Sequence, residues 1–206
     1  MNWSTMWQQL QLTPPSTLAE ALNAAYSQPH RYYHTLQHLQ ECLSLLTQLQ
    51  HLATQPEQIA LALYFHDAVY DVHANDNEAK SAAWATCLLR EIGASSVLIA
   101  RIETLIMATQ HHAPSLASDT DSQLLVDIDL AILGREPTRF AEYEQQIRQE
   151  YHWVNTEQFK QGRGQVLRSF LERPTIYHTD YFRQHFEPQA RENIQQSLYH
   201  LAVLES

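Results

Sequence analysis

The stretch IALALYFHDAVYD, residues 59–71, places His66 and Asp67 among apolar residues. Pro56, just upstream, is a residue that favours the first turn of a helix. We therefore predict a buried helix that carries the His-Asp pair. An ionised aspartate is costly in an apolar interior unless a cation meets it, so the pair indicates a site for a divalent metal ion.

A second histidine motif, RYYHTLQH, lies upstream at residues 31–38. We expect it in a long helix over residues 33–52, because leucines recur there at nearly the helical period. His34 and His38 are four residues apart and would share one face of that helix. Half-exposed surface histidines are the alternative, since the chain contains 12 histidines.

A pair of carboxylates follows in LLVDIDLAILG, residues 124–134. On a helix, Asp127 and Asp129 would point to opposing sides, so that one could bind an ion while the other orients a neighbouring group. Hydrogen bonds to backbone or arginine groups are the alternative for both. Because apolar residues flank the two acids, we expect each to have a partner.

The composition favours a folded, helical chain. Of its 206 residues, 44% are apolar and 17% are charged, and only 4 are glycine, which leaves little material for hairpin turns. Two capping boxes, at Thr17–Glu20 and Asn155–Gln158, indicate helix starts. We predict an all-α fold with about ten helices in a single domain over residues 1–206.

Charge and hydropathy exclude several classes of function. The formal net charge of −10 argues against a nucleic-acid-binding surface, which is normally basic. The N-terminus does not resemble a secretion signal, and no window approaches the roughly 18 consecutive apolar residues of a membrane span. Cys42 and Cys87 form no CxxC motif and are expected as small buried side chains. We expect a reduced, cytoplasmic protein without a membrane or nucleic-acid partner.

The order His, His-Asp, Asp on the helices of an all-α chain resembles the HD superfamily of metal-dependent phosphohydrolases. The strings RYYHTLQH, FHDAVYD, NDNEAKSA and VDIDLAILG are similar to those of a bacterial branch of predicted HD phosphohydrolases of comparable length. The likeness extends through IRQEY, GRGQVL and ARENI, so that it covers nearly the whole chain. The combined set of motifs is specific, whereas no single motif is. The resemblance implies one HD-type helical bundle.

The resemblance also implies a set of metal ligands: His38, His66, Asp67 and Asp129. Asp129 is preferred to Asp127 because the last aspartate of the family usually follows a small or apolar residue and precedes a turn that contains leucine. Asp127 would then orient a neighbouring group. Two nitrogen and two carboxylate donors suit Mn²⁺, Fe²⁺, Co²⁺ or Mg²⁺, and Zn²⁺ also fits.

Asp71 and Glu78 are the predicted catalytic residues. Asp71 is expected on the same helix face as Asp67, where it would orient or deprotonate the attacking water. This placement is similar to that in HD hydrolases of guanosine tetraphosphate-type alarmones, which carry Glu-Asp where this chain has Tyr70-Asp71. Because Tyr70 replaces a carboxylate, we do not infer the alarmone reaction. A loop position for Asp71, and an ordinary first-turn acid for Glu78, are the alternatives.

Five residues are predicted to contact the substrate: Arg31, His34, Lys80, His112 and Arg163. His112 ends an apolar helix and would reach the open side of the metal or a second ion; stabilisation of the helix end is the alternative. We expect a metal-dependent phosphohydrolase that cleaves a phosphomonoester or phosphoanhydride in a small, nucleotide-like metabolite with a metal-activated water. A non-catalytic sensor that binds a metal or a nucleotide is the alternative.

Overall fold

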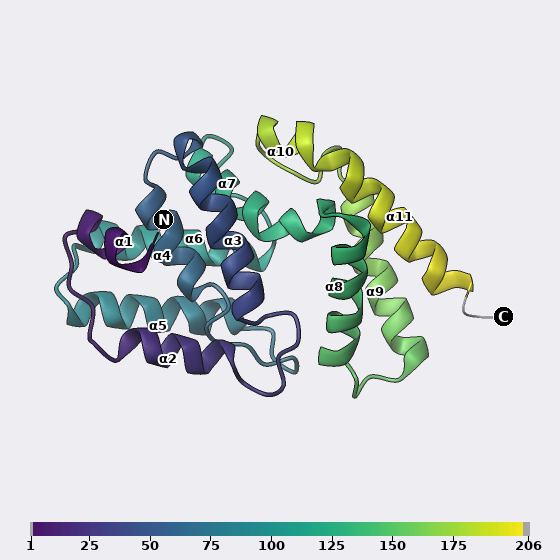
Figure 1. The fold of residues 1–206 in the computed structure, drawn as a ribbon, viewed down its shortest axis with the longest axis horizontal. Coiled ribbons are helices and arrows are strands. Elements are labelled where there is room, and N and C mark those ends of the chain that lie inside the picture. The colour runs from purple at the N-terminus through teal and green to yellow at the C-terminus, as the bar shows by residue number, and fades with distance from the viewer. Residues whose placement is uncertain (1, 204–206) are drawn as a thin grey trace. The chain divides into compact units, whose positions relative to one another are not determined.

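The chain folds into helices alone in the part that the structure describes, residues 2–203 of a computed structural model. This part contains eleven α-helices and two short 3₁₀-helices, and no strand (Figure 1). The predicted all-α class is confirmed. Contacts group the chain into two compact units, one up to Asp129 and one from Leu130 onward. A single domain over residues 1–206 stays a prediction.

The first unit contains seven α-helices and one 3₁₀-helix within its described residues. They are α1 (Trp3–Gln9), α2 (Leu18–Tyr26), α3 (Leu36–Leu49), η1 (Gln50–Leu52), α4 (Pro56–Phe65), α5 (Asn77–Glu91), α6 (Ser96–Gln110) and α7 (Thr120–Asp129). The helix α4 is central, because it packs against α1, α3, α5, α6 and α7. Residues 59–63 and 65 of α4 are fully buried, which confirms the buried helix predicted there.

The end of α4 differs from the prediction. The helix ends at Phe65, His66 caps its C-terminus, and Asp67 lies in the turn that follows. The His-Asp pair therefore terminates the buried helix rather than lying within it. His66 and Asp67 therefore follow the last residue of α4, whose own side chains are buried in the core.

The predicted start of the long histidine-bearing helix is also corrected. The helix α3 begins at Leu36, because Thr35 has an extended backbone and its side chain accepts a hydrogen bond from the backbone N–H of Gln37. A threonine in this conformation is an N-cap. His34 therefore precedes the helix, and its presumed common helix face with His38 does not exist.

The other predicted helix starts give a mixed outcome. Pro56 lies in the first turn of its helix, as predicted, and Pro137 likewise begins a helix. The Asn155 side chain accepts a hydrogen bond from the backbone N–H of Gln158, which confirms that cap. The cap predicted at Thr17 is wrong: its backbone is already helical, and its side chain makes no capping hydrogen bond.

The second unit contains the remaining helices. They are η2 (Leu130–Gly134), α8 (Pro137–Glu150), α9 (Thr156–Leu171), α10 (Asp180–His185) and α11 (Glu187–Val203). The Tyr177 side chain is fully buried, and its hydroxyl donates a hydrogen bond to the carbonyl of Leu130 over 3.1 Å. A Cβ at Gly134 would lie 2.6 Å from the carbonyl oxygen of Phe186, so only glycine allows this close approach.

Two further predictions concern the burial of the cysteines and the lack of a membrane-spanning helix. Cys42 is buried, as expected, but Cys87 is exposed, because it lies on the outward side of α5 between the buried residues Thr86 and Leu88. Within residues 2–203, no helix is long and apolar enough to cross a membrane.

Candidate metal centre

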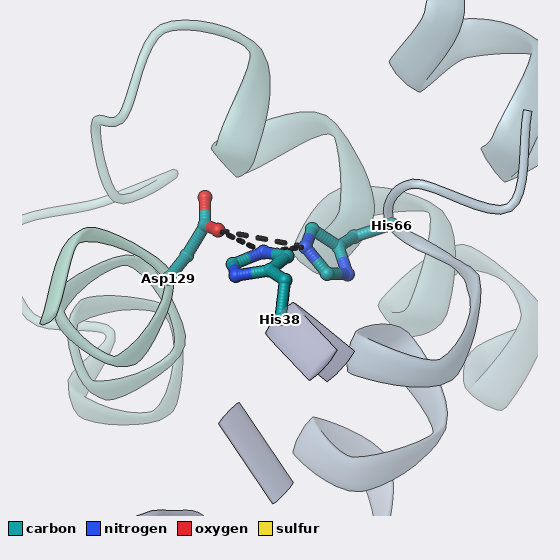
Figure 2. A group of neighbouring side chains, drawn as sticks. All are labelled: His38, His66 and Asp129. Atoms are coloured by element: carbon teal, nitrogen blue, oxygen red, sulfur yellow. Dashed lines mark hydrogen bonds and ion pairs between the residues drawn. The ribbon is translucent and has the colours of Figure 1, made fainter. Parts of the chain in front are cut away.

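Three side chains from different helices of the first unit converge on one point. His38 comes from α3, His66 from the end of α4, and Asp129 is the last residue of α7. Figure 2 shows the two imidazoles and the carboxylate facing one another. Their ligand atoms all lie within 4.8 Å of one another, and this group could hold a metal ion. Asp127, fully buried in α7, does not belong to this group of described residues.

The separations of the ligand atoms fit a common ion. The Nε2 atoms of His38 and His66 are 3.1 Å apart, and Oδ1 of Asp129 lies 3.2 Å from the first and 3.5 Å from the second. Donors to one first-row metal ion lie about 2.0–2.2 Å from it, so neighbouring donors lie about 3.0–3.5 Å from one another. The observed distances fit donors to one ion.

Hydrogen bonding also prepares His66 for coordination. Its Nδ1 lies 2.8 Å from the carbonyl oxygen of Leu63 in α4. A carbonyl oxygen can only accept, so Nδ1 carries the proton and Nε2 of the neutral ring presents a lone pair. This arrangement, with one ring nitrogen bonded to the backbone and the other directed at the ion, is typical of metal-binding histidines.

Asp67 adds a fourth group to the cluster. Its Oδ2 lies 3.0 Å from Nε2 of His66 and 3.5 Å from Nε2 of His38. The Asp67 side chain is only 15% exposed, and that of Asp129 only 12%, so both carboxylates are largely removed from water. All four ligands that the family resemblance implies thus lie around the same position. Coordination by Asp67 stays a prediction.

The protonation of the cluster follows from its burial and its charges. Burial lowers the pKa of the His66 imidazole, but Asp67 and Asp129 outweigh burial and raise that pKa well above its ordinary value. Burial raises the pKa of each of the two carboxyls, but the neighbouring histidines outweigh it, and both values lie below the ordinary range. Without a metal ion, the raised pKa favours the charged form of His66, and a metal ion that binds through Nε2 must displace the proton there.

Cys42 is a neighbour of the cluster that sequence reasoning assigned only to the core. Its Sγ lies 3.7 Å from Nδ1 and 3.8 Å from Nε2 of His38. The two residues are four apart on α3, so their helical spacing was a signal for this contact. The thiol packs against the His38 ring, as groups that orient metal-binding histidines do.

Two further predicted histidines approach the cluster. The His34 ring stacks on the ring of Tyr70, with their centroids 4.1 Å apart, and its charge contributes to the lowered pKa of Asp67. Nε2 of His112 lies 3.7 Å from Oδ2 of Asp129. The backbone φ of His112 is +47°, a conformation that non-glycine residues rarely adopt and that is frequent at functional sites. Contact of either histidine with a substrate stays a prediction.

The predicted catalytic residues have other surroundings than expected. Asp71 does not share a helix with Asp67, because α4 ends at Phe65, and its Oδ1 accepts a hydrogen bond from the backbone N–H of His73 in an exposed turn. Asp71 therefore lies in a loop, which was the alternative to the predicted helix position. Glu78 lies half-buried in the first turn of α5. Catalytic roles for Asp71 and Glu78 stay predictions without a geometric argument.

The three predicted phosphate-binding cations are engaged by protein groups. Arg31 is only 5% exposed and donates hydrogen bonds to the carbonyls of His34, Asp67 and Ala68. Half-exposed Lys80 pairs with Asp76 over 2.7 Å.

Arg163 belongs to the second unit, where its buried guanidinium forms an ion pair with Glu144 and lies over the Tyr143 ring. Burial lowers the pKa of Arg163, but Tyr143 and Glu144 outweigh burial and raise it. For all three cations, contact with phosphate stays a prediction.

Comparisons with known proteins add no relative. No protein-family model, no curated protein and no solved structure matches the chain. The resemblance to the HD superfamily therefore depends on the sequence motifs alone. What the structure adds is the buried group of His38, His66 and Asp129, which could hold a metal ion.

Proposed function

We propose that this protein is a metal-dependent phosphohydrolase of the HD type that cleaves a phosphomonoester or phosphoanhydride in a small, nucleotide-like metabolite. One observation carries the proposal: two imidazole nitrogens and a carboxylate oxygen, from three helices, lie 3.1–3.5 Å apart in a buried position. Ligands of this kind and spacing fit a divalent first-row ion.

The chain would hold the ion with His38, His66, Asp129 and Asp67. When bound, a divalent ion lowers the pKa of water and offsets the negative charge that develops on a phosphoryl group. Mn²⁺, Fe²⁺, Co²⁺ and Mg²⁺ suit the mixed nitrogen and oxygen donors, and Zn²⁺ also fits. The net charge of −10 disfavours the approach of an anionic substrate, and a bound ion would supply local positive charge at this site.

The residues at the edge of the cluster have the chemistry to orient a phosphate. Nε2 of His112 lies 3.7 Å from Oδ2 of Asp129, the charge of His34 lowers the pKa of Asp67, and both imidazoles are only partly buried. A ring N–H can donate a hydrogen bond to a phosphate oxygen, most strongly when the imidazole is charged. We assign to these two residues the positioning of the substrate.

A non-catalytic sensor is the second candidate, and Tyr70 is the observation that favours it. Related alarmone hydrolases carry a carboxylate at this position, whereas the Tyr70 ring stacks here against His34 and lies 5.4 Å from the guanidinium carbon of Arg31. An aromatic ring cannot accept a proton from water. A sensor would keep the metal and the ligand and would lack turnover.

A panel of nucleotides and generic phosphoesters, assayed with Mn²⁺, Co²⁺ or Mg²⁺, tests the proposal. We expect turnover with at least one metal and its loss in the His66→Ala and Asp67→Ala variants. His51→Ala, which removes an exposed histidine of η1, is the matched control and should retain activity. Asp129→Asn should weaken metal retention more than Asp127→Asn, because Asp129 belongs to the cluster.

The outcomes separate the candidates. Turnover that survives both His66→Ala and Asp67→Ala excludes the mechanism. Binding of metal and nucleotide without hydrolysis under any condition favours the sensor. A folded protein that is purified without chelator and contains no metal, and that takes up none when metal is added, contradicts the phosphohydrolase and a metal-binding sensor.

A further inference from the structure

Arg31 is a buried cation that lies between two segments near the site, the loop that carries His34 and the turn that carries Asp67. Its side chain joins the loop before α3, which holds His34, to the turn after α4, which holds Asp67. A buried guanidinium is costly unless its donors are satisfied. The groups that satisfy it indicate what it does.

The guanidinium of Arg31 is directed at backbone oxygens. Nη1 donates to the carbonyl of Asp67 over 2.6 Å and to that of His34 over 3.1 Å, and Nη2 donates to the carbonyl of Ala68 over 3.0 Å. Nε donates to the side-chain oxygen of Gln28 over 3.1 Å. The planar fork of arginine is suited to bind several acceptors at once in fixed directions.

Tyr26 holds the other peptide group of Asp67. Its hydroxyl oxygen accepts a hydrogen bond from the Asp67 N–H over 3.3 Å and lies 3.3 Å from the carbonyl oxygen of Tyr64, to which it donates. The guanidinium carbon of Arg31 lies 5.3 Å from the centre of the Tyr26 ring. Asp67 is therefore fixed at both its N–H and its carbonyl, which restricts the direction of its carboxylate.

Arg31 also orients the partner of His34. Its guanidinium carbon lies 5.4 Å from the centre of the Tyr70 ring, and the His34 ring stacks on the same Tyr70 ring at 4.1 Å. One side chain thus contacts the backbone of His34 and the ring that supports the His34 imidazole. A contact to phosphate, as the sequence suggested for Arg31, would compete with these four hydrogen bonds.

We propose that Arg31 is a positioning residue of the metal centre, which fixes Asp67 and His34 through their backbones and does not contact the substrate. The inference rests on the proposed function, because it requires that the cluster binds a metal ion. Neighbouring groups that orient metal ligands typically change metal affinity about 10- to 100-fold when they are removed.

The test is a Co²⁺ titration of the full-length protein, which follows affinity and the visible absorption spectrum of the bound ion. For Arg31→Met, which keeps a long side chain but loses the donors, we expect the Kd for Co²⁺ to rise about 10- to 100-fold. The absorption band should shift, because the ligand geometry changes. Arg31→Lys keeps the charge and part of the donors and should recover part of the affinity and of the spectrum.

Arg191→Met is the matched control, because it removes from the second unit another guanidinium that donates to backbone carbonyls, those of Leu171 and Arg173, and should leave Co²⁺ binding unchanged. Circular dichroism establishes that each variant is folded, and Arg31→Lys carries the test if Arg31→Met does not fold. Unchanged Kd and spectrum in a folded Arg31 variant overturn the inference but leave the metal centre in place. A wild-type protein that binds no Co²⁺ overturns the metal centre and the inference together.

Discussion

Two groups of acidic residues in the first unit differ in the partners that neutralise them. At the start of α7, the Asp119 carboxylate receives two hydrogen bonds from the Arg101 guanidinium, over 2.5 and 2.8 Å. Asp121 accepts hydrogen bonds from two backbone N–H groups ahead of α4. At the other end of α7, Asp129, together with Asp67, faces imidazoles instead.

The difference lies in the permanence of the positive charge. A guanidinium is always charged, so the acids beside Arg101 need no further cation. An imidazole can lose its proton and then offers a lone pair, so Asp67 and Asp129 depend on a proton or an external ion. The nature of the partner, rather than the number of buried acids, therefore distinguishes a structural ion pair from a candidate metal centre.

The largest expected effect comes from removing an imidazole. His66→Ala should raise the Kd for Co²⁺ more than about 100-fold, beyond the typical effect of a group that only orients a ligand. Arg101→Met should leave that Kd unchanged, because Arg101 pairs with Asp119, which does not belong to the cluster. Isothermal titration calorimetry of both variants measures the difference. Equal losses of affinity in the two variants would mean that the two groups are not distinct.

The comparison also predicts a dependence of metal binding on pH. The raised pKa of His66 means that the ring is protonated below that value, and the ion must then displace this proton. Co²⁺ affinity should therefore fall about tenfold for each pH unit below the pKa of His66. Asp67 and Asp129 have lowered pKa values and stay ionised over that range. Titrations at several pH values test this slope, and an affinity independent of pH would contradict it.

The Arg101 group should affect stability without affecting the metal. The Arg101 guanidinium lowers the pKa of Asp119 to about 2, so the folded state is stabilised above the ordinary carboxyl pKa and loses this contribution as the pH falls towards 2. Asp119→Asn should lower the free energy of unfolding by about 1–2 kcal/mol at neutral pH, since the pair is partly exposed.

Urea denaturation of the metal-free protein measures this difference, which should shrink as the pH is lowered. Co²⁺ affinity of Asp119→Asn should equal that of the wild type. A loss of metal affinity in this variant would show that the two ends of α7 are coupled.

The smallest effect is expected at an exposed ion pair. Lys80 and Asp76 are each about half exposed, and such pairs contribute little because water and salt screen them. Lys80→Ala should change the free energy of unfolding by less than about 0.5 kcal/mol and should not change Co²⁺ affinity. If Lys80 contacts phosphate, as the sequence predicts, its loss will instead raise KM in the hydrolysis assay.

Local signals in the sequence predicted the helices better than their ends. Pro56 and the apolar residues after it identified α4. The end of α4 has no such signal, because apolar Ala68 and Val69 follow Phe65 without glycine or proline. Hydrogen bonds from Arg31 and Tyr26, which are distant in sequence, hold the turn after α4. Threonine is a preferred N-cap residue, so Thr35 was a signal in the sequence that α3 begins after His34.

The candidate site shows the same division. The family resemblance identified His38, His66 and Asp129 together, and Asp129 also stands out because it lies between the apolar residues Ile128 and Leu130. The support of the site could not be predicted in this way. Arg31 resembles any phosphate-binding cation until its carbonyl partners are known, and Cys42 resembles any core residue until its sulfur is found beside His38.

Gly134 has a consequence for the tolerance of the chain to random mutation. A single methyl group there would collide with the backbone of Phe186, which cannot move aside as a flexible side chain can. In a library of variants selected for correct folding, this position should accept no other amino acid. Gly162, around which a Cβ would find open space, should accept alanine freely.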